Sequence, residues 1–266
     1  MKHILTSISL MFLTIRFYGF QNEPLKADLH VHLTNKSGVS AGQRYDKAAA
    51  LSKKMGVVFG IAEEINYYDL KKNDDTLQAR LTLVKKYSLY LGLQVNQPGW
   101  DRYFSKDLTN KVDYIMEDAL RFPDKNGQVR LLWYPDVVFT DAQDFMERYV
   151  AYNLIVLSDP INIWVNPTYL PESLQKRYDE LWTDKRMKRL IDTAVKNKIA
   201  IEINSRYKIP SKKFIQMAKA AGAHFTFGSN QHDTNIGEIE WSVKIAEDCG
   251  LTKKDFFIPQ RTLATK

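Results

Sequence analysis

The sequence predicts an α/β fold, a distorted (β/α)7 barrel of TIM-like plan in a single domain. Seven apolar, strand-like runs alternate with helix-like segments, and no flexible linker or change in composition separates them. Alternation of this kind requires a parallel sheet, and seven units in one run favour a closed sheet over an open one. No glycine-rich phosphate-binding turn follows the first strand, which argues against a dinucleotide-binding or P-loop fold. An open doubly wound sheet is the alternative.

The strand-like runs follow one another at 25–33, 57–62, 89–96, 112–116, 161–167, 199–204 and 224–229. Helices are expected between them at 45–55, 75–87, 141–157, 171–197, 210–221 and 236–249, with a short amphipathic piece near 104–110. Gly56, Gly222 and Gly250 stand where helices commonly end. Residues 121–140 form the longest irregular stretch. We expect an inserted loop there that leans over a site, with a hairpin around 131–134.

Residues 1–20 are typical of a secretory signal peptide. Lys2 supplies the charged start, and the apolar run from Ile4 to Ile15 is too short and too rich in Ser and Thr for a membrane span. We therefore expect the barrel domain to occupy residues 21–266 and to be secreted or periplasmic. No association with a membrane is expected once the signal is removed.

The composition limits the possible partners. At 266 residues and 44% hydrophobic content, the chain can bury a sizeable core. Cys249 is its only cysteine, which excludes an internal disulfide and a cysteine metal cluster. The net charge of +7 is scattered as Lys-Lys pairs, mostly beside acids. This pattern predicts a solvated helix surface and no nucleic-acid binding, and it supports only a modest preference for a small anionic substrate. Nothing in the composition indicates an oligomeric state.

The first strand carries the stretch Asp28-Leu29-His30-Val31-His32. Because side chains alternate along a strand, Asp28, His30 and His32 are expected on one face. Two imidazoles and a carboxylate in line suit a divalent metal, and His232 lies in a second polar stretch. The alternative is that these histidines are half-buried strand residues with local hydrogen bonds.

Polar residues interrupt the apolar strands at the carboxyl end of each one, where parallel barrels build their active sites. Glu202 lies between Ile201 and Ile203, so we expect its carboxylate in the barrel mouth, within bonding reach of His30, His32 or Arg206. The full set comprises His30, His32, Glu63, Glu64, Gln94, Asn96, Glu117, Asp118, Asn166, Glu202, Asn204, Asn230 and His232.

Together these residues resemble the PHP (polymerase and histidinol phosphatase) family. The stretch 28–32 is similar to the family's opening His-x-His motif, 227–232 to its closing Ser-Asp-x-His motif, and 200–204 to the glutamate-containing strand before it. The resemblance covers roughly residues 25–258. It implies a seven-stranded distorted barrel, a cluster of metals and phosphatase activity.

The sequence departs from the family pattern at four positions. Ala62-Glu63-Glu64 stands in place of Thr-Asp-His, Gln94 (or Asn96) in place of a glutamate, Asn166-Pro167 in place of His-Pro, and Asn230 in place of an aspartate. Amides bind transition metals poorly. We therefore expect no more than one divalent metal, zinc or else manganese or iron, held by His30, His32 and His232 with Glu63 or Glu202.

Three functions are compatible with these residues. The first is a secreted, metal-dependent hydrolase, chiefly a phosphoesterase, in which the metal polarises the scissile group and ionises a water. Its catalytic carboxylates would be Glu63, Glu202 and Asp118, and its substrate-binding residues Arg206, Asn166, Asn204, Gln94 and Asn230. For Arg206, a salt bridge at the rim is the alternative.

The second function is a carbohydrate-active enzyme without a metal. Glu63 or Glu202 would be acid and base in a mouth lined by aromatic side chains. The candidate aromatic residues are Trp100, Trp133, Tyr134 and Trp164. The third function is a binding protein that has lost catalysis. Metal content distinguishes the first function from the other two, and turnover distinguishes the second from the third.

Overall fold

The computed structural model describes residues 26–33, 37–65, 67–232 and 236–260. The signal peptide predicted at residues 1–20 lies outside these ranges. Within them, no helix is long and apolar enough to cross a membrane.

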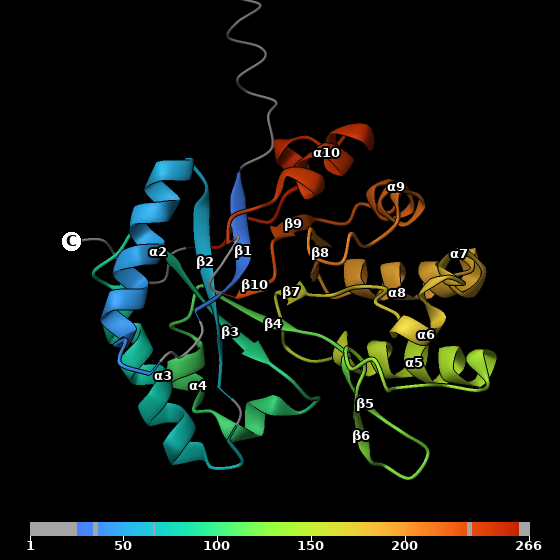
Figure 1. Cartoon of the computed structure of the whole chain (residues 1–266), viewed down its shortest axis with the longest axis horizontal. Coiled ribbons are helices and arrows are strands. Elements are labelled where there is room, and N and C mark those ends of the chain that lie inside the picture. The colour runs from blue at the N-terminus through green and yellow to red at the C-terminus, as the bar shows by residue number, and fades with distance from the viewer. Residues whose placement is uncertain (1–25, 34–36, 66, 233–235, 261–266) are drawn as a thin grey trace, which may run out of the picture.

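Among the described residues, seven parallel strands close into a barrel (Figure 1). Each strand pairs with the next along the chain, and the last pairs back onto the first through Asp28 and Phe227. The predicted single-domain, distorted (β/α)7, TIM-like barrel is thus confirmed. The strands are β1 (Ala27–His32), β2 (Val58–Glu64), β3 (Tyr90–Val95), β4 (Tyr114–Glu117), β7 (Ile163–Trp164), β8 (Ala200–Asn204) and β9 (Phe225–Gly228). The short strand β10 (Gln231–His232) pairs in parallel with the end of β1.

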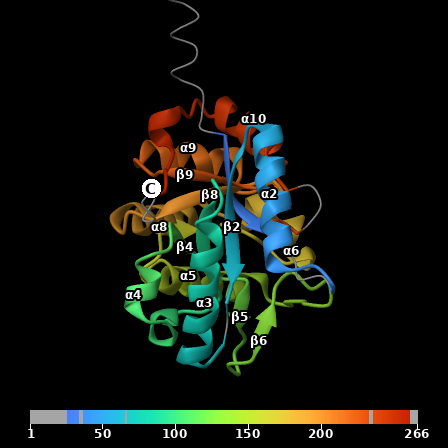
Figure 2. The ribbon, with the colours of Figure 1, turned by 90° about the vertical axis from the view of Figure 1, so that its left-hand side faces the viewer.

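Helices form the outer layer, and from one side α2 and α3 flank β2 (Figure 2). The longer helices are α2 (Ala41–Met55), α3 (Leu70–Val84), α5 (Ala142–Val156), α8 (Asp184–Lys196), α9 (Lys212–Ala220) and α10 (Glu240–Asp248). Shorter elements are η1 (Trp100–Tyr103), α4 (Lys106–Thr109), α6 (Glu172–Gln175), α7 (Tyr178–Leu181) and η2 (Lys253–Asp255).

Helices α2 and α3 begin about one turn before their predicted starts, because capping residues lie upstream of the apolar pattern. Ser40 and Gln43 form a capping box at α2, and Asp69 accepts a hydrogen bond from the backbone of Lys72 at α3. At the other end of α2, Gly56 has φ 65, the left-handed conformation expected of a helix-ending glycine.

The inserted loop contains a hairpin formed by β5 (Arg121–Pro123) and β6 (Val129–Leu131), earlier in the chain than predicted. Asp124 fixes its turn by accepting hydrogen bonds from the backbone of Asn126 and Gln128. Arg121 and Trp133 from this segment line the hollow at the barrel mouth, as expected of a loop that leans over a site.

The lower part of the barrel is filled by an apolar cluster that includes Leu29 and Tyr114. Tyr114 occupies space left by Gly60 and Gly92, where an added Cβ would overlap its ring or hydroxyl. Its hydroxyl donates a hydrogen bond of 2.6 Å to the carbonyl oxygen of Leu29. Together these side chains form an apolar plug that closes the floor of the barrel.

Candidate active site

His30 and Glu202 form a buried pair inside the barrel, between β1 and β8. His30 Nδ1 lies 2.6 Å from Glu202 Oε1, and both side chains are about 1% exposed. Gly228 makes room for the pair, because a Cβ there would overlap Glu202 Oε1. The prediction that Glu202 faces the barrel mouth within reach of a histidine is confirmed. Burial alone would lower the pKa of the His30 imidazole, but the Glu202 carboxylate outweighs this and raises the pKa above its usual value.

The second oxygen of Glu202 begins a network of amides. Oε2 accepts hydrogen bonds from the backbone N–H of Asn166 at 2.7 Å and from Asn204 Nδ2 at 3.0 Å. Asn166 Oδ1 in turn accepts from Nδ2 of Asn204 at 3.0 Å and of Asn230 at 2.9 Å. Four residues predicted for the site thus hold one another in place, and both oxygens of Glu202 are occupied within the protein.

Asp118 extends the network to the wall of the mouth. It follows β4, is 5% exposed, and accepts hydrogen bonds from Asn166 Nδ2 at 2.7 Å and from the backbone N–H of Leu120 at 2.9 Å. Burial raises the pKa of its carboxyl to about 6, against the lowering effect of these two donors. Asp118 therefore changes protonation state near neutral pH.

The other two histidines predicted as metal ligands, His32 and His232, lie at the top of the mouth. The rings of His32 and His232 are stacked, with centroids 4.3 Å apart and planes 10° from parallel, while His30 meets His32 edge-on at 4.9 Å. Burial, helped by the neighbouring histidines, lowers the pKa of His32 well below its usual value. His32 is therefore neutral at pH 7.

This stacking does not fit the predicted three-imidazole metal site. Imidazole nitrogens bind zinc in the ring plane at about 2.1 Å, and an ion in the plane of His32 would lie well out of the parallel plane of His232. Across the described residues, which omit 233–235 next to His232, no group of three or more His, Cys, Asp or Glu side chains is arranged to hold a metal. The occupied oxygens of Glu202 also make it the partner of His30 rather than a metal ligand.

Above the network, a hollow of about 220 Å³ opens at the barrel mouth. Arg206 lies at its rim, where Nη1 donates a 3.0 Å hydrogen bond to the carbonyl oxygen of Asn230. His30, Glu202 and Asn204 are fully buried and do not line the hollow. The predicted residues that line it are His32, Glu64, Gln94, Asn96, Asp118, Trp133, Asn166, Arg206, Asn230 and His232. Arg121 lies in the inserted loop expected over the site, but neither it nor Tyr207, which follows Arg206, was predicted as a site residue.

Glu63 is not part of this site. Its carboxylate points into the helix layer, where it accepts hydrogen bonds from the Tyr45 hydroxyl at 2.8 Å and from Arg80 Nε at 3.0 Å. The predicted roles of Glu63 as metal ligand and catalytic acid are therefore wrong. Its neighbour Glu64 faces the hollow instead, since adjacent strand residues point to opposite sides.

Asp28 also points away from the mouth, so the expectation that it shares a face with His30 and His32 is wrong. The register between β1 and β2 shifts between Asp28 and Val31, which breaks the alternation of side chains. The Asp28 carboxylate instead accepts hydrogen bonds from the backbone of Ser229 at 2.9 Å and of Gly237 at 3.0 Å. It ties β1 to the segment that follows β9.

Comparison with known proteins adds little to this geometry. No family model matches the sequence, and no curated protein matches it. One similar solved structure is that of a Bacteroides thetaiotaomicron protein, provisionally assigned as an alpha-L-fucosidase. The two chains are 12% identical, with a TM-score of 0.40 over 85% of this chain and 84% of the other. A likeness this weak carries no argument about activity, and the resemblance to the PHP family stays a prediction.

Proposed function

We propose that the chain is a hydrolase that cleaves a small anionic ester, with phosphate esters as the expected class, at the mouth of the barrel. The observation that carries this proposal is the Asp118 carboxylate, held by two donors in the wall of an open hollow. Burial raises the pKa of this carboxyl to about 6. A general acid or base works best when its pKa lies near the working pH. The resemblance of the opening and closing motifs to a phosphatase family supports the same class.

The hollow also provides groups suited to an anion. Arg206 and Arg121 both line it, and the hydrogen bond to Asn230 holds Arg206 at the rim. Guanidinium groups bind phosphate or carboxylate oxygens through two parallel hydrogen bonds. Asp118 would then accept a proton from an attacking water, or donate one to the leaving oxygen, while the His30–Glu202 pair and its amides keep the wall fixed.

A single divalent metal stays a prediction, as does secretion. His30 has the environment of a ligand, because a carboxylate holds its Nδ1 while its buried Nε2 has no hydrogen-bond partner within the described chain. A metal bound there would supply Lewis-acid chemistry. Elemental analysis of protein purified without added metal tests this point, and two or three equivalents would show that the amides are ligands after all.

The proposal is tested by turnover of a panel of phosphate monoesters and diesters, with glycosides as a second panel. We expect phosphoester hydrolysis with a pH-rate profile that changes near pH 6, and a loss of about 10²–10⁴ in kcat for Asp118→Asn. Asp136→Asn is the matched control, since Asp136 is an exposed acid that does not line the hollow. Turnover of glycosides alone, or an unchanged rate in Asp118→Asn, would overturn the proposal.

A further inference from the structure

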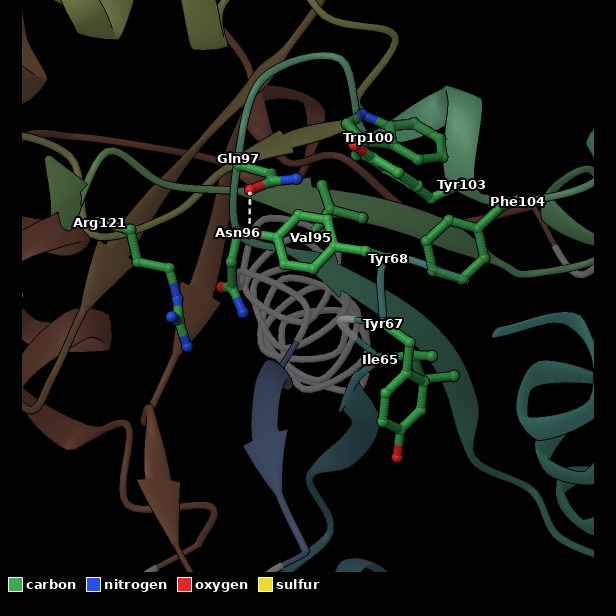
Figure 3. A pocket seen from close by; sticks show the side chains of 10 residues that line it. All are labelled: Ile65, Tyr67, Tyr68, Val95, Asn96, Gln97, Trp100, Tyr103, Phe104 and Arg121. Atoms are coloured by element: carbon green, nitrogen blue, oxygen red, sulfur yellow. Dashed lines mark hydrogen bonds between the residues drawn. The ribbon is translucent and has the colours of Figure 1, made fainter. Parts of the chain in front are cut away.

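A second cavity of about 160 Å³ adjoins the barrel mouth (Figure 3). It lies between the segment after β2, the end of β3 and η1, and aromatic side chains form much of its wall. Asn96 and Arg121 line both this cavity and the hollow at the mouth. A molecule bound with one end in the hollow can therefore extend into the aromatic cavity.

Two buried donors in the wall of this cavity have no acceptor among the described residues, which omit residue 66. Asn96 is 7% exposed and Trp100 is 4% exposed, and neither Asn96 Nδ2 nor Trp100 Nε1 has a hydrogen-bond partner in the described part of the protein. Buried polar groups are normally paired, and an unpaired one calls for an explanation such as an absent ligand. Both residues line the same cavity, and a small turn of each side chain would bring its nitrogen, closed off in the free protein, within reach of one ligand that carries oxygen acceptors.

Exposed tyrosine rings stand beside these donors. Tyr68 is 78% exposed, yet its ring is held in place because its hydroxyl donates to Gln97 Oε1 at 3.2 Å and its edge meets the Tyr103 ring at 5.6 Å. Tyr67 is 40% exposed, and Lys72 Nζ lies 3.8 Å from the centre of its ring. In Figure 3 the Tyr68 ring lies in front of Val95, and a dashed line joins its hydroxyl to Gln97.

We propose that this cavity is a subsite for a sugar ring, and that the substrate is a phosphorylated sugar. A pyranose offers an apolar C–H face that can pack on Tyr68 and a rim of hydroxyl oxygens that can accept from Asn96 and Trp100. A hydrocarbon or simple aromatic ring would fill the space but leave both donors unpaired. The inference rests on the proposed function, because it places the ester phosphate in the neighbouring hollow between Arg121 and Arg206.

Calorimetric titration tests the subsite with defined probes. The probes are inorganic phosphate, phenyl phosphate, the free sugars glucose, galactose and mannose, and the 6-phosphates of these sugars, with Asp118→Asn used to prevent turnover. We expect at least one sugar phosphate to bind about tenfold more tightly than inorganic phosphate, as one or two added hydrogen bonds would give. Tyr68→Ala and Trp100→Phe should each remove most of this gain and leave the affinity for inorganic phosphate unchanged, because both residues line the aromatic cavity and not the hollow. Tyr134→Ala is the matched control, because Tyr134 is 50% exposed and lines neither cavity.

The outcomes separate the subsite from the proposed function. If phosphate binds and phosphoesters turn over but sugar phosphates bind no more tightly, or phenyl phosphate binds as well as they do, the subsite is wrong and the proposed function stands. If free sugars bind in a Tyr68-dependent way while phosphate does not, the sugar subsite is supported and the phosphoesterase is wrong. If neither phosphate nor sugar binds, both are wrong.

Discussion

The two sides of the barrel mouth differ in how their buried polar groups are paired. On the side of β7, β8 and β9, Glu202, Asn166 and Asn204 bond to one another, and Asn230 joins them. On the opposite side, at the end of β3 and in η1, the described residues provide no partner for Gln94 Oε1, Asn96 Nδ2 or Trp100 Nε1. All of these groups are buried, so the difference is not one of solvent access.

This contrast shows which side is framework and which side is open to a ligand. A buried polar group that is paired stabilises the fold, whereas an unpaired one weakens it. The paired side therefore fixes the geometry of the mouth in the free protein. On the unpaired side the described residues supply no partner, so a bound molecule would add hydrogen bonds there, and substitutions on the two sides should separate stability from binding.

Glu202→Ala should have the largest effect. The substitution removes the acceptor of His30 Nδ1, Asn166 N and Asn204 Nδ2 at once and leaves these donors buried. Removing one member of a buried charged pair destabilises a protein by about 3–5 kcal/mol. Urea denaturation followed by circular dichroism measures the change in the free energy of unfolding. A loss below about 1 kcal/mol would contradict the assignment of this side as the structural framework.

A second test compares Asp118 with its neighbour Glu117, which faces the helix layer instead of the mouth. Glu117 is fully buried, and burial, with the charges of Asp159 and Asp118, raises its pKa to about 10. When folding raises the pKa of a carboxyl, the folded protein loses stability as the pH rises from the pKa of that group in the unfolded chain toward its pKa in the folded protein. The native protein should therefore lose about 3 kcal/mol of stability from this group between pH 4.5 and pH 7.

Glu117→Gln should remove that dependence, because glutamine stays neutral and keeps an N–H donor facing Asp159. The variant should match the native protein near pH 4.5 and exceed it in stability at pH 7, while its activity stays unchanged. Thermal unfolding at a series of pH values is the measurement. Equal pH dependence in the two proteins would show that Glu117 is ionised in the fold.

The barrel and part of the mouth could be predicted because their signals are local. The alternation of strand-like and helix-like runs is a property of neighbouring residues, and it is enough to imply the closed parallel sheet. The inward position of Glu202 follows from its two isoleucine neighbours in a strand that keeps strict alternation. Polar residues at the strand ends identify the rim without any knowledge of the tertiary contacts.

The predictions for Glu63 and Asp28 were wrong because the direction of these side chains does not follow from the local sequence pattern. The residues before Glu63 are apolar on both faces, so nothing in the sequence shows whether Glu63 or Glu64 faces inward. The register shift that turns Asp28 away depends on how β1 pairs with β2. The cavity at Trp100 depends on a short 3-10 helix after β3 that carries no periodic signal.

The smallest expected effect on stability is that of Asn96→Leu, with Asn204→Leu as its matched partner across the mouth. Asn204 donates to Glu202 and Asn166 and accepts a 3.0 Å hydrogen bond from the backbone of Tyr207, so its loss removes three hydrogen bonds and leaves the Tyr207 N–H without this acceptor. We expect Asn204→Leu to lower the free energy of unfolding by about 2–3 kcal/mol. Asn96 Nδ2 makes no hydrogen bond to the rest of the described chain, so the substitution removes none. We expect Asn96→Leu to change the free energy of unfolding by less than about 0.5 kcal/mol, or to raise it slightly. Parallel urea titrations of the two variants measure this difference. Equal losses would mean that both sides of the mouth belong to the framework, and that the unpaired donors do not mark a ligand site.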